Sequence, residues 1–189
     1  MSKTKRAAIA GLILLLVGSG LLIHIIRSQA VSATNIVAPP SAVTAQQSKP
    51  NEIQGQPTEL LIPSLNMDLP VIPGYYDART KAWTLTLSEV QYATITPQPN
   101  NLEGNTFLYG HYRQAVFAWL HTIPSGAQAI VKTSNGHTFY YQLASIRTTD
   151  PGDDSVFTYR GKPILTIQTC TGLFFQYRQF YTFNLIKVT

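Results

Sequence analysis

An uncharged segment near the N-terminus limits what the rest of this 189-residue chain can fold into. Ala7 to Ile26 are twenty residues without a Lys, Arg, Asp or Glu. At a rise of about 1.5 Å per residue, a helix of this length crosses the hydrocarbon core of a bilayer. We therefore predict a transmembrane helix over residues 7–26, so that a folded domain must come from the residues that follow it.

Basic residues flank this segment unevenly and predict its orientation. Three lie before it and one follows it closely, namely Lys3, Lys5, Arg6 and Arg27. By the positive-inside rule, residues 1–6 are cytoplasmic and the chain after the segment is extracellular, which makes a single-pass protein of the cell membrane. A cleaved signal peptide is the alternative, because Val31-Ser32-Ala33 is similar to a small-residue cleavage site. Secretory apolar cores are usually shorter, about 7–15 residues.

Residues 27–57 separate the apolar segment from the remaining chain. They are rich in Ser, Ala, Gln, Asn and Pro and show no sustained period of 2 or 3.6. Such a composition predicts a flexible linker. Residues 58–189 then form one domain, long enough to bury its own core.

Positive charge is concentrated in the first 57 residues, which carry five basic residues and one acidic residue. Residues 58–189 carry nine basic and eight acidic residues and are nearly neutral. A nucleic-acid-binding domain has its basic residues clustered on the folded part. We therefore attribute the basicity to membrane topology and predict no nucleic-acid partner.

Short β-rich runs separated by turn residues fill the domain. The clearest pair is Ala127 to Thr133 and His137 to Arg147, which are separated by Ser134-Asn135-Gly136, a strong hairpin signal. Other strand-like runs lie at residues 60–62, 69–73, 82–87, 105–111, 157–160, 164–169 and 179–188. Only residues 87–92 and 115–120 are helix candidates. We predict an all-β barrel or sandwich of seven or eight strands with one or two short helices.

The only cysteine, Cys170, lies where a short apolar strand ends. Ile164, Leu165 and Ile167 form that strand, and the small residues around the cysteine, through Gly172, indicate a change from strand to loop. One cysteine cannot form an internal disulfide. The thiol is therefore either an inert buried group or a nucleophile that needs a base and an oxyanion partner.

Two other reactive side chains also fall at strand ends. Arg178 comes eight residues after Cys170, at the start of a run that can return antiparallel beside the cysteine strand. Its five-donor guanidinium suits the stabilisation of an oxyanion. His111 follows Gly110 at the end of the apolar run from Asn105.

Three motifs in this order resemble those of the sortases. T-I-Q-T-C, Thr166 to Cys170, is similar to the family's T-L-x-T-C, and G-N-T-F-L-Y-G-H, Gly104 to His111, is similar to its G-N-x-x-x-x-G-H. Arg178 holds the place of the family's essential arginine. The resemblance runs from near Glu59 to the C-terminus. It implies a closed sortase-like β-barrel in which Cys170 is the nucleophile, His111 the acid/base and Arg178 the donor to substrate and oxyanion.

The resemblance also implies an activity and its partners. Sortases are cysteine transpeptidases that anchor surface proteins in Gram-positive cell walls. The chain would cleave a C-terminal sorting signal similar to L-P-x-T-G between Thr and Gly through a thioester. It would transfer the acyl group to an amine of a cell-wall precursor or a pilin, without a cofactor. The short chain with one N-terminal span is more similar to the compact classes, D, E and F, than to the class with a second span.

Five residues near the three motifs are candidates for substrate binding. Thr169 and Thr171 flank the cysteine, and Phe174 and Phe175 follow it in the loop. Tyr109 stands before Gly110, where many sortases have a small residue, so its ring is expected to narrow the groove.

The remaining polar residues give weaker signals. Asp150, Asp153 and Asp154, with Glu103, suggest calcium, but their spacing matches no EF-hand loop and favours a solvated acidic loop. We predict no metal. His121 and His137 belong to no motif, and structural roles are favoured for both.

Two other classes of protein remain as alternatives. L,D-transpeptidases also use Cys, His and Arg on the cell wall, but their arginine lies almost beside the cysteine. A non-enzymatic, anchored β-barrel for adhesion or assembly would keep Cys170 as an inert core thiol.

Overall fold

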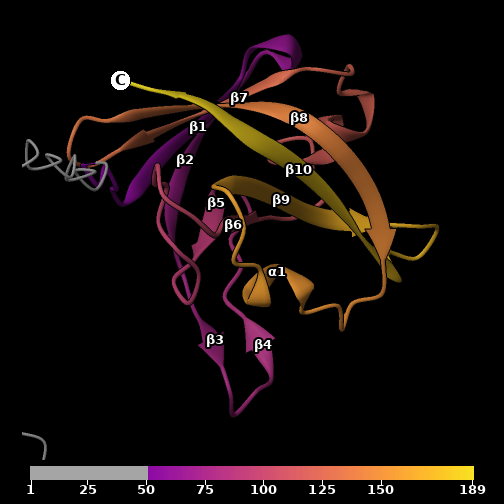
Figure 1. Ribbon diagram of the computed structural model, residues 1–189. Coiled ribbons are helices and arrows are strands. Elements are labelled where there is room, and N and C mark those ends of the chain that lie inside the picture. The colour runs from indigo at the N-terminus through magenta and orange to yellow at the C-terminus, as the bar shows by residue number, and fades with distance from the viewer. Residues whose placement is uncertain (1–50) are drawn as a thin grey trace, which may run out of the picture. The chain divides into compact units, whose positions relative to one another are not determined.

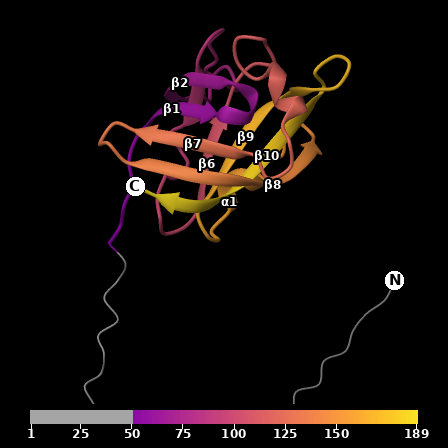
Figure 2. The ribbon, with the colours of Figure 1, turned by 90° about the horizontal axis from the view of Figure 1, so that it is seen from above.

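Residues 51–189 are described by the computed structural model, and they form a closed eight-stranded barrel. The strand order around it is β1-β2-β5-β6-β9-β10-β8-β7 (Figures 1 and 2). The barrel strands are β1 (Pro57–Ile62), β2 (Met67–Gly74), β5 (Val90–Ala93), β6 (Asn105–Tyr109), β7 (Gln128–Thr133), β8 (Thr138–Thr149), β9 (Ile164–Thr171) and β10 (Tyr177–Val188). The predicted closed, all-β barrel is confirmed.

Five short elements lie outside the barrel wall. Two strands, β3 (Tyr76–Asp77) and β4 (Ala82–Trp83), form a separate hairpin, which extends from one end of the barrel in Figure 1. The helices are short: η1 (Pro63–Leu65), η2 (Ala118–Thr122) and α1 (Ser155–Thr158). Within residues 51–189, no helix has the length and apolar character that crossing a membrane requires. The predicted transmembrane helix lies outside the described residues.

The chain is already attached to the barrel before β1. The Ile53 amide donates to Asn101 Oδ1 over 2.9 Å, and the Asn101 side-chain amide donates to the Asn51 carbonyl over 2.9 Å. Asn135, in the β7–β8 turn, donates to the Gln54 carbonyl over 2.8 Å. Residues 51–57, which the sequence analysis placed in the linker, are therefore held by the domain.

The predicted β7–β8 hairpin is present, with Gly136 in the positive-φ turn position.

Three local predictions were wrong. Residues 87–92 were a helix candidate, but Val90–Ala93 form β5, whose four residues are all buried between β2 and β6. Residues 157–160 were read as a strand, but Ser155–Thr158 form α1. The run 82–87 is a strand only at Ala82–Trp83.

The barrel encloses the main core, and a second apolar cluster lies on the outside of its wall. Along β6 the side chains alternate: Leu108 belongs to the main core, whereas Phe107 and Tyr109 belong to the second cluster. On β10, Phe180 joins the second cluster while Tyr181 and Phe183 face the main core, because successive side chains of a strand point to opposite faces. The outer cluster joins β6 and β10 to β4 and α1.

Candidate active site

Strand pairing brings the three predicted catalytic residues together. Cys170 on β9 and Arg178 on β10 are direct antiparallel partners, so their side chains leave the sheet on the same face. On the other side of β9, β6 runs parallel, with Tyr109 opposite Gln168. The Gly110 amide extends this pairing by donating to the Gln168 carbonyl over 3.1 Å, which brings His111 to the level of Cys170.

All three residues line one groove of about 440 Å³. Cys170, His111 and Arg178 are each partly exposed. β9 continues through Thr171, so Cys170 lies inside the end of the strand and not after it. A thiol, an imidazole and a guanidinium therefore share one solvent-accessible groove, a combination suited to nucleophilic attack on a carbonyl.

The backbone before His111 is fixed by its packing. Thr169 is buried, and its hydroxyl donates to the Gly110 carbonyl over 3.1 Å. A Cβ atom at Gly110 would lie 2.8 Å from Val116 and 3.0 Å from Phe117. The glycine before the histidine is thus required by close packing. Thr169 holds this backbone, and its predicted contact with substrate stays a prediction.

The hairpin β3–β4 provides one wall of the groove through Trp83. The Trp83 ring stacks on Phe157 at 5.7 Å between centroids and meets Tyr109 edge-on at 5.3 Å. Such aromatic contacts each contribute about 0.5–1.5 kcal/mol beyond burial of area. The sequence analysis missed Trp83, because nothing in the run 82–87 indicated which surface the hairpin would cover.

Tyr109 forms part of the groove lining but is almost completely buried, with 4% of its surface exposed. Burial raises the pKa of its phenol, and its hydroxyl lies 3.4 Å from the Thr84 hydroxyl. A Cβ atom at Gly74 would lie only 2.1 Å from the Tyr109 hydroxyl oxygen. The ring therefore has a fixed place under the groove, and its predicted role in substrate choice stays a prediction.

The loop between β9 and β10 is held by the arginine itself. Arg178 Nη1 donates to the carbonyls of Phe175 and Tyr177, each over 3.1 Å. Phe175 is half exposed, whereas Phe174 is 82% exposed and lines none of the cavities described below. The structure thus separates two neighbouring phenylalanines that the sequence analysis treated alike.

A second cavity, of about 220 Å³, also reaches Cys170. Thr169, Thr171 and Phe175 line it, but His111 and Arg178 do not. His121 and Tyr112 form another side of it. The sequence analysis found no signal for either residue, because only the fold brings the segment after His111 next to the β9–β10 loop.

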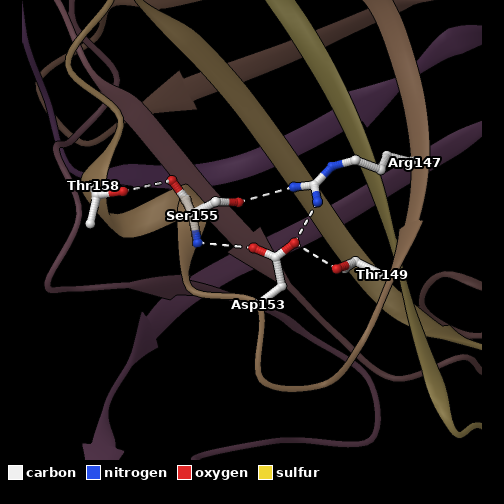
Figure 3. Close-up of polar contacts among 5 residues, drawn as sticks. All are labelled: Arg147, Thr149, Asp153, Ser155 and Thr158. Atoms are coloured by element: carbon white, nitrogen blue, oxygen red, sulfur yellow. Dashed lines mark hydrogen bonds and ion pairs between the residues drawn. The ribbon is translucent and has the colours of Figure 1, made fainter.

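Of the acidic residues in the predicted loop, Asp153 alone lines the groove that contains Cys170, and Figure 3 shows its polar contacts. Its carboxylate accepts hydrogen bonds from the Ser155 amide, over 2.9 Å, and from the side chains of Thr149 and Arg147. Arg147 also donates to the Ser155 hydroxyl over 3.0 Å. The loop was expected to be solvated, but at Asp153 it is hydrogen-bonded to β8 and α1.

Within residues 51–189, no three His, Cys, Asp or Glu side chains are grouped to hold a metal ion.

Comparison with known proteins agrees with this arrangement of strands. A family model described as "Sortase domain" matches residues 60–188. Sortase E1 from Streptomyces coelicolor, whose structure holds a tripeptide in the active site, is 25% identical, with a TM-score of 0.55 over 71% of this chain and 90% of that one. A comparison with curated protein sequences gave no match.

Two class C enzymes share the fold at lower identity. Sortase C1 from Streptococcus agalactiae is 21% identical, with a TM-score of 0.55 over 69% of this chain and 67% of that one. Sortase C-1 from Actinomyces oris is 23% identical, with a TM-score of 0.54 over 69% of this chain and 73% of that one. The family model and the fold identify a transpeptidase of the sortase type. The chain belongs to the sortase family.

The contacts of Asp153 predict a pH-dependent contribution to stability. Hydrogen bonds from Ser155, Thr149 and Arg147 hold the pKa of Asp153 well below its usual range. A lowered pKa in the folded state stabilises the fold above the unfolded value, near 3.9, and the contribution is lost as the pH falls below it. We expect Asp153→Asn to reduce the free energy of unfolding by about 1 kcal/mol at pH 7. The difference from wild type should shrink between about pH 5 and pH 3.

Chemical unfolding followed by tryptophan fluorescence at several pH values measures this difference. Asp154→Asn is the matched control, because Asp154 is exposed and its side chain makes no hydrogen bond to residues 51–189. Equal stability of Asp153→Asn and wild type at pH 7 would show that the network contributes nothing.

Proposed function

We propose that this sortase is a membrane-anchored cysteine transpeptidase that cleaves a C-terminal sorting signal similar to L-P-x-T-G between Thr and Gly. It transfers the acyl group to an amine of a cell-wall precursor or a pilin. The observation that carries the proposal is the direct pairing of Cys170 with Arg178 in the groove that His111 also lines. Its substrates are surface proteins that bear the sorting signal.

In the first half of the reaction, the thiolate of Cys170 attacks the carbonyl carbon of the Thr–Gly bond. The guanidinium of Arg178 donates to the oxyanion, which such a planar donor stabilises strongly in a partly dehydrated groove. His111 gives a proton to the leaving amine as the C–N bond breaks. The product is a thioester on Cys170, which conserves the acyl bond outside the cell without ATP.

Three observations support this reading over an inert core thiol. Cys170 is partly exposed and borders two cavities, whereas an inert thiol is enclosed by apolar side chains. The groove beside it has an aromatic wall at Trp83 and Tyr109 and a cation at Arg178, which suit an extended peptide with apolar side chains. The Streptomyces coelicolor relative holds a tripeptide in its active site.

We also propose that residues 7–26 anchor the enzyme, with the N-terminus in the cytoplasm and residues 58–189 extracellular. The uncharged run and the basic residues before it support this orientation. A protease added to wall-stripped, intact cells should then release a fragment that begins within residues 27–50. A fragment released only after the membrane is permeabilised would show the opposite orientation. A free mature protein that begins after Ala33 would show signal-peptide cleavage.

Cys170→Ala tests the nucleophile. In the full-length protein in detergent, we expect this variant to lose cleavage of L-P-x-T-G-type peptides and to keep its melting temperature within a few degrees. Because the side chain is small and partly exposed, its truncation leaves little cavity. Intact-protein mass spectrometry should detect the acyl adduct in wild type and not in the variant. Undiminished cleavage by Cys170→Ala would end the cysteine mechanism.

Arg178→Lys tests the oxyanion donor, because lysine keeps the charge but not the planar fork. Loss of a positioned donor commonly reduces turnover by about 10²–10³, so we expect kcat to fall by that order with little change in melting temperature.

Arg160→Lys is a closely matched control. Arg160 Nη1 donates to the carbonyls three residues and one residue before it, Phe157 and Tyr159, in the same pattern that Arg178 makes with Phe175 and Tyr177. Arg160 does not line the groove. Equal turnover in both lysine variants would remove Arg178 from the mechanism.

A further inference from the structure

The β3–β4 hairpin has a free edge beside the catalytic groove. It is a sheet of two strands, so within residues 51–189 each strand has one edge without a partner strand. The hairpin residues that line the groove lie on β4 or within two residues of it, and none lies on β3: Lys81, Ala82, Trp83 and Leu85. Figure 1 shows β4 on the side of the hairpin nearer α1, in agreement with the stack of Trp83 on Phe157. The open edge of β4 is therefore the one that borders the groove.

The hydrogen bonds of the hairpin determine where the Trp83 backbone points. The Thr84 amide donates to the Tyr75 carbonyl over 2.9 Å, and Trp83 is the register partner of Tyr76. In an antiparallel pair of strands, hydrogen-bonded and non-hydrogen-bonded partners alternate. Trp83 is thus at a non-hydrogen-bonded position, and its N–H and C=O point away from β3 toward the free edge. Among residues 51–189, neither group has a hydrogen-bond partner.

Contacts of two side chains fix this edge relative to the barrel. The Trp83 ring attaches β4 to Tyr109 on β6 and to Phe157 in α1. The Thr84 hydroxyl accepts a hydrogen bond from the Tyr75 amide over 2.9 Å and lies 3.4 Å from the Tyr109 hydroxyl. A strand held in this way is pre-organised, so a peptide that pairs with it does not have to order it first.

The position of Trp83 in the groove indicates which part of a substrate reaches this edge. Tyr109, which Trp83 contacts, pairs with Gln168, two residues before Cys170 on β9. With the Thr carbonyl of the proposed sorting signal at Cys170 and its Leu-Pro pair at the aromatic wall, the chain before the signal continues along β4. The proline of the signal lacks an N–H, so continuous pairing with a strand is open only to the residues before it.

We propose that the substrate segment that precedes the sorting signal binds the free edge of β4 as an added strand. Trp83 donates its N–H to one carbonyl of this segment and accepts a hydrogen bond from one of its N–H groups, as in strand addition to other sheet edges. Because backbone groups carry the recognition, the segment must be extended and free of proline at the pairing position, whereas its side chains can vary. This inference rests on the proposed function and extends its recognition site beyond the sorting signal.

Two peptides and two variants test the edge. One peptide begins at the Leu of an L-P-x-T-G-type signal, and the other carries four alanines before that Leu. Trp83→Pro and Trp83→Leu both lose the ring, but only proline lacks the N–H. Because that N–H points away from β3, proline leaves the pairing of the hairpin in place. KM and kcat are measured for the full-length protein in detergent, together with the melting temperature of each variant.

We expect the wild type and Trp83→Leu to have a KM about tenfold lower for the longer peptide than for the shorter one, as one or two backbone hydrogen bonds contribute. In Trp83→Pro this ratio should fall to about threefold, because one of the two bonds is lost. Each protein should have the same kcat for both peptides, since these contacts are equal in the bound substrate and the transition state.

An ester scan in the wild type makes the test independent of how the variants fold. Each of the four alanines is replaced in turn by lactic acid, which removes one N–H without adding bulk. KM should rise where the N–H pairs with Trp83 and stay unchanged at the two neighbouring positions. Successive N–H groups of a strand point to opposite edges, so strand pairing requires this alternation.

Equal KM values of the wild type for the two peptides would overturn the inference. It would also be overturned if Trp83→Leu lost as much as Trp83→Pro, because the ring would then hold the segment, or if the ester scan showed no alternation. In each of these cases, cleavage of the short peptide leaves the proposed function intact. If the wild type cleaves neither peptide, the proposed function fails and this inference fails with it.

Discussion

The register between β9 and β10 is the constraint on which the site depends. Direct pairing of Cys170 with Arg178 puts the two side chains on one face of the sheet, a few ångströms apart at their Cβ atoms. A slip of one residue would turn Arg178 toward the barrel core. The register is stabilised because Tyr181 and Phe183, farther along β10, are buried in that core. Packing inside the barrel therefore fixes the relative position of Cys170 and Arg178 at its rim.

At the site, the main core packs against the inner face of the barrel wall and the outer cluster packs against its outer face. The outer cluster attaches the β3–β4 hairpin and α1 to β6 and β10 through stacked rings, among them Trp83 and Phe157. Asp153 also lines the catalytic groove, and its hydrogen bonds to Arg147 and Ser155 hold it in place (Figure 3). Trp83 and Asp153 both lie outside the barrel strands, whereas Cys170 and Arg178 lie on them.

Arg178 takes part in two features of this arrangement. It faces Cys170 across the strand pair, and it also donates to the loop that carries Phe175. The residue proposed to stabilise the oxyanion in the groove thus supports the wall of the second cavity as well.

Local patterns in the sequence were sufficient for the hairpin at Asn135-Gly136, the strands around it and the placement of Cys170, His111 and Arg178 at strand ends. Turn chemistry and side-chain alternation act between near neighbours, so they can be read directly from the chain. Other parts of the fold and the site could not be predicted from such patterns. Val90–Ala93 is a strand because β2 and β6 pair with it. The helix α1 has only four residues, too few to show the 3.6-residue periodicity of a helix in the sequence. His121 lines a cavity together with Cys170 because the parallel pairing of β6 with β9 brings two segments that are distant in the sequence side by side, which no local pattern records.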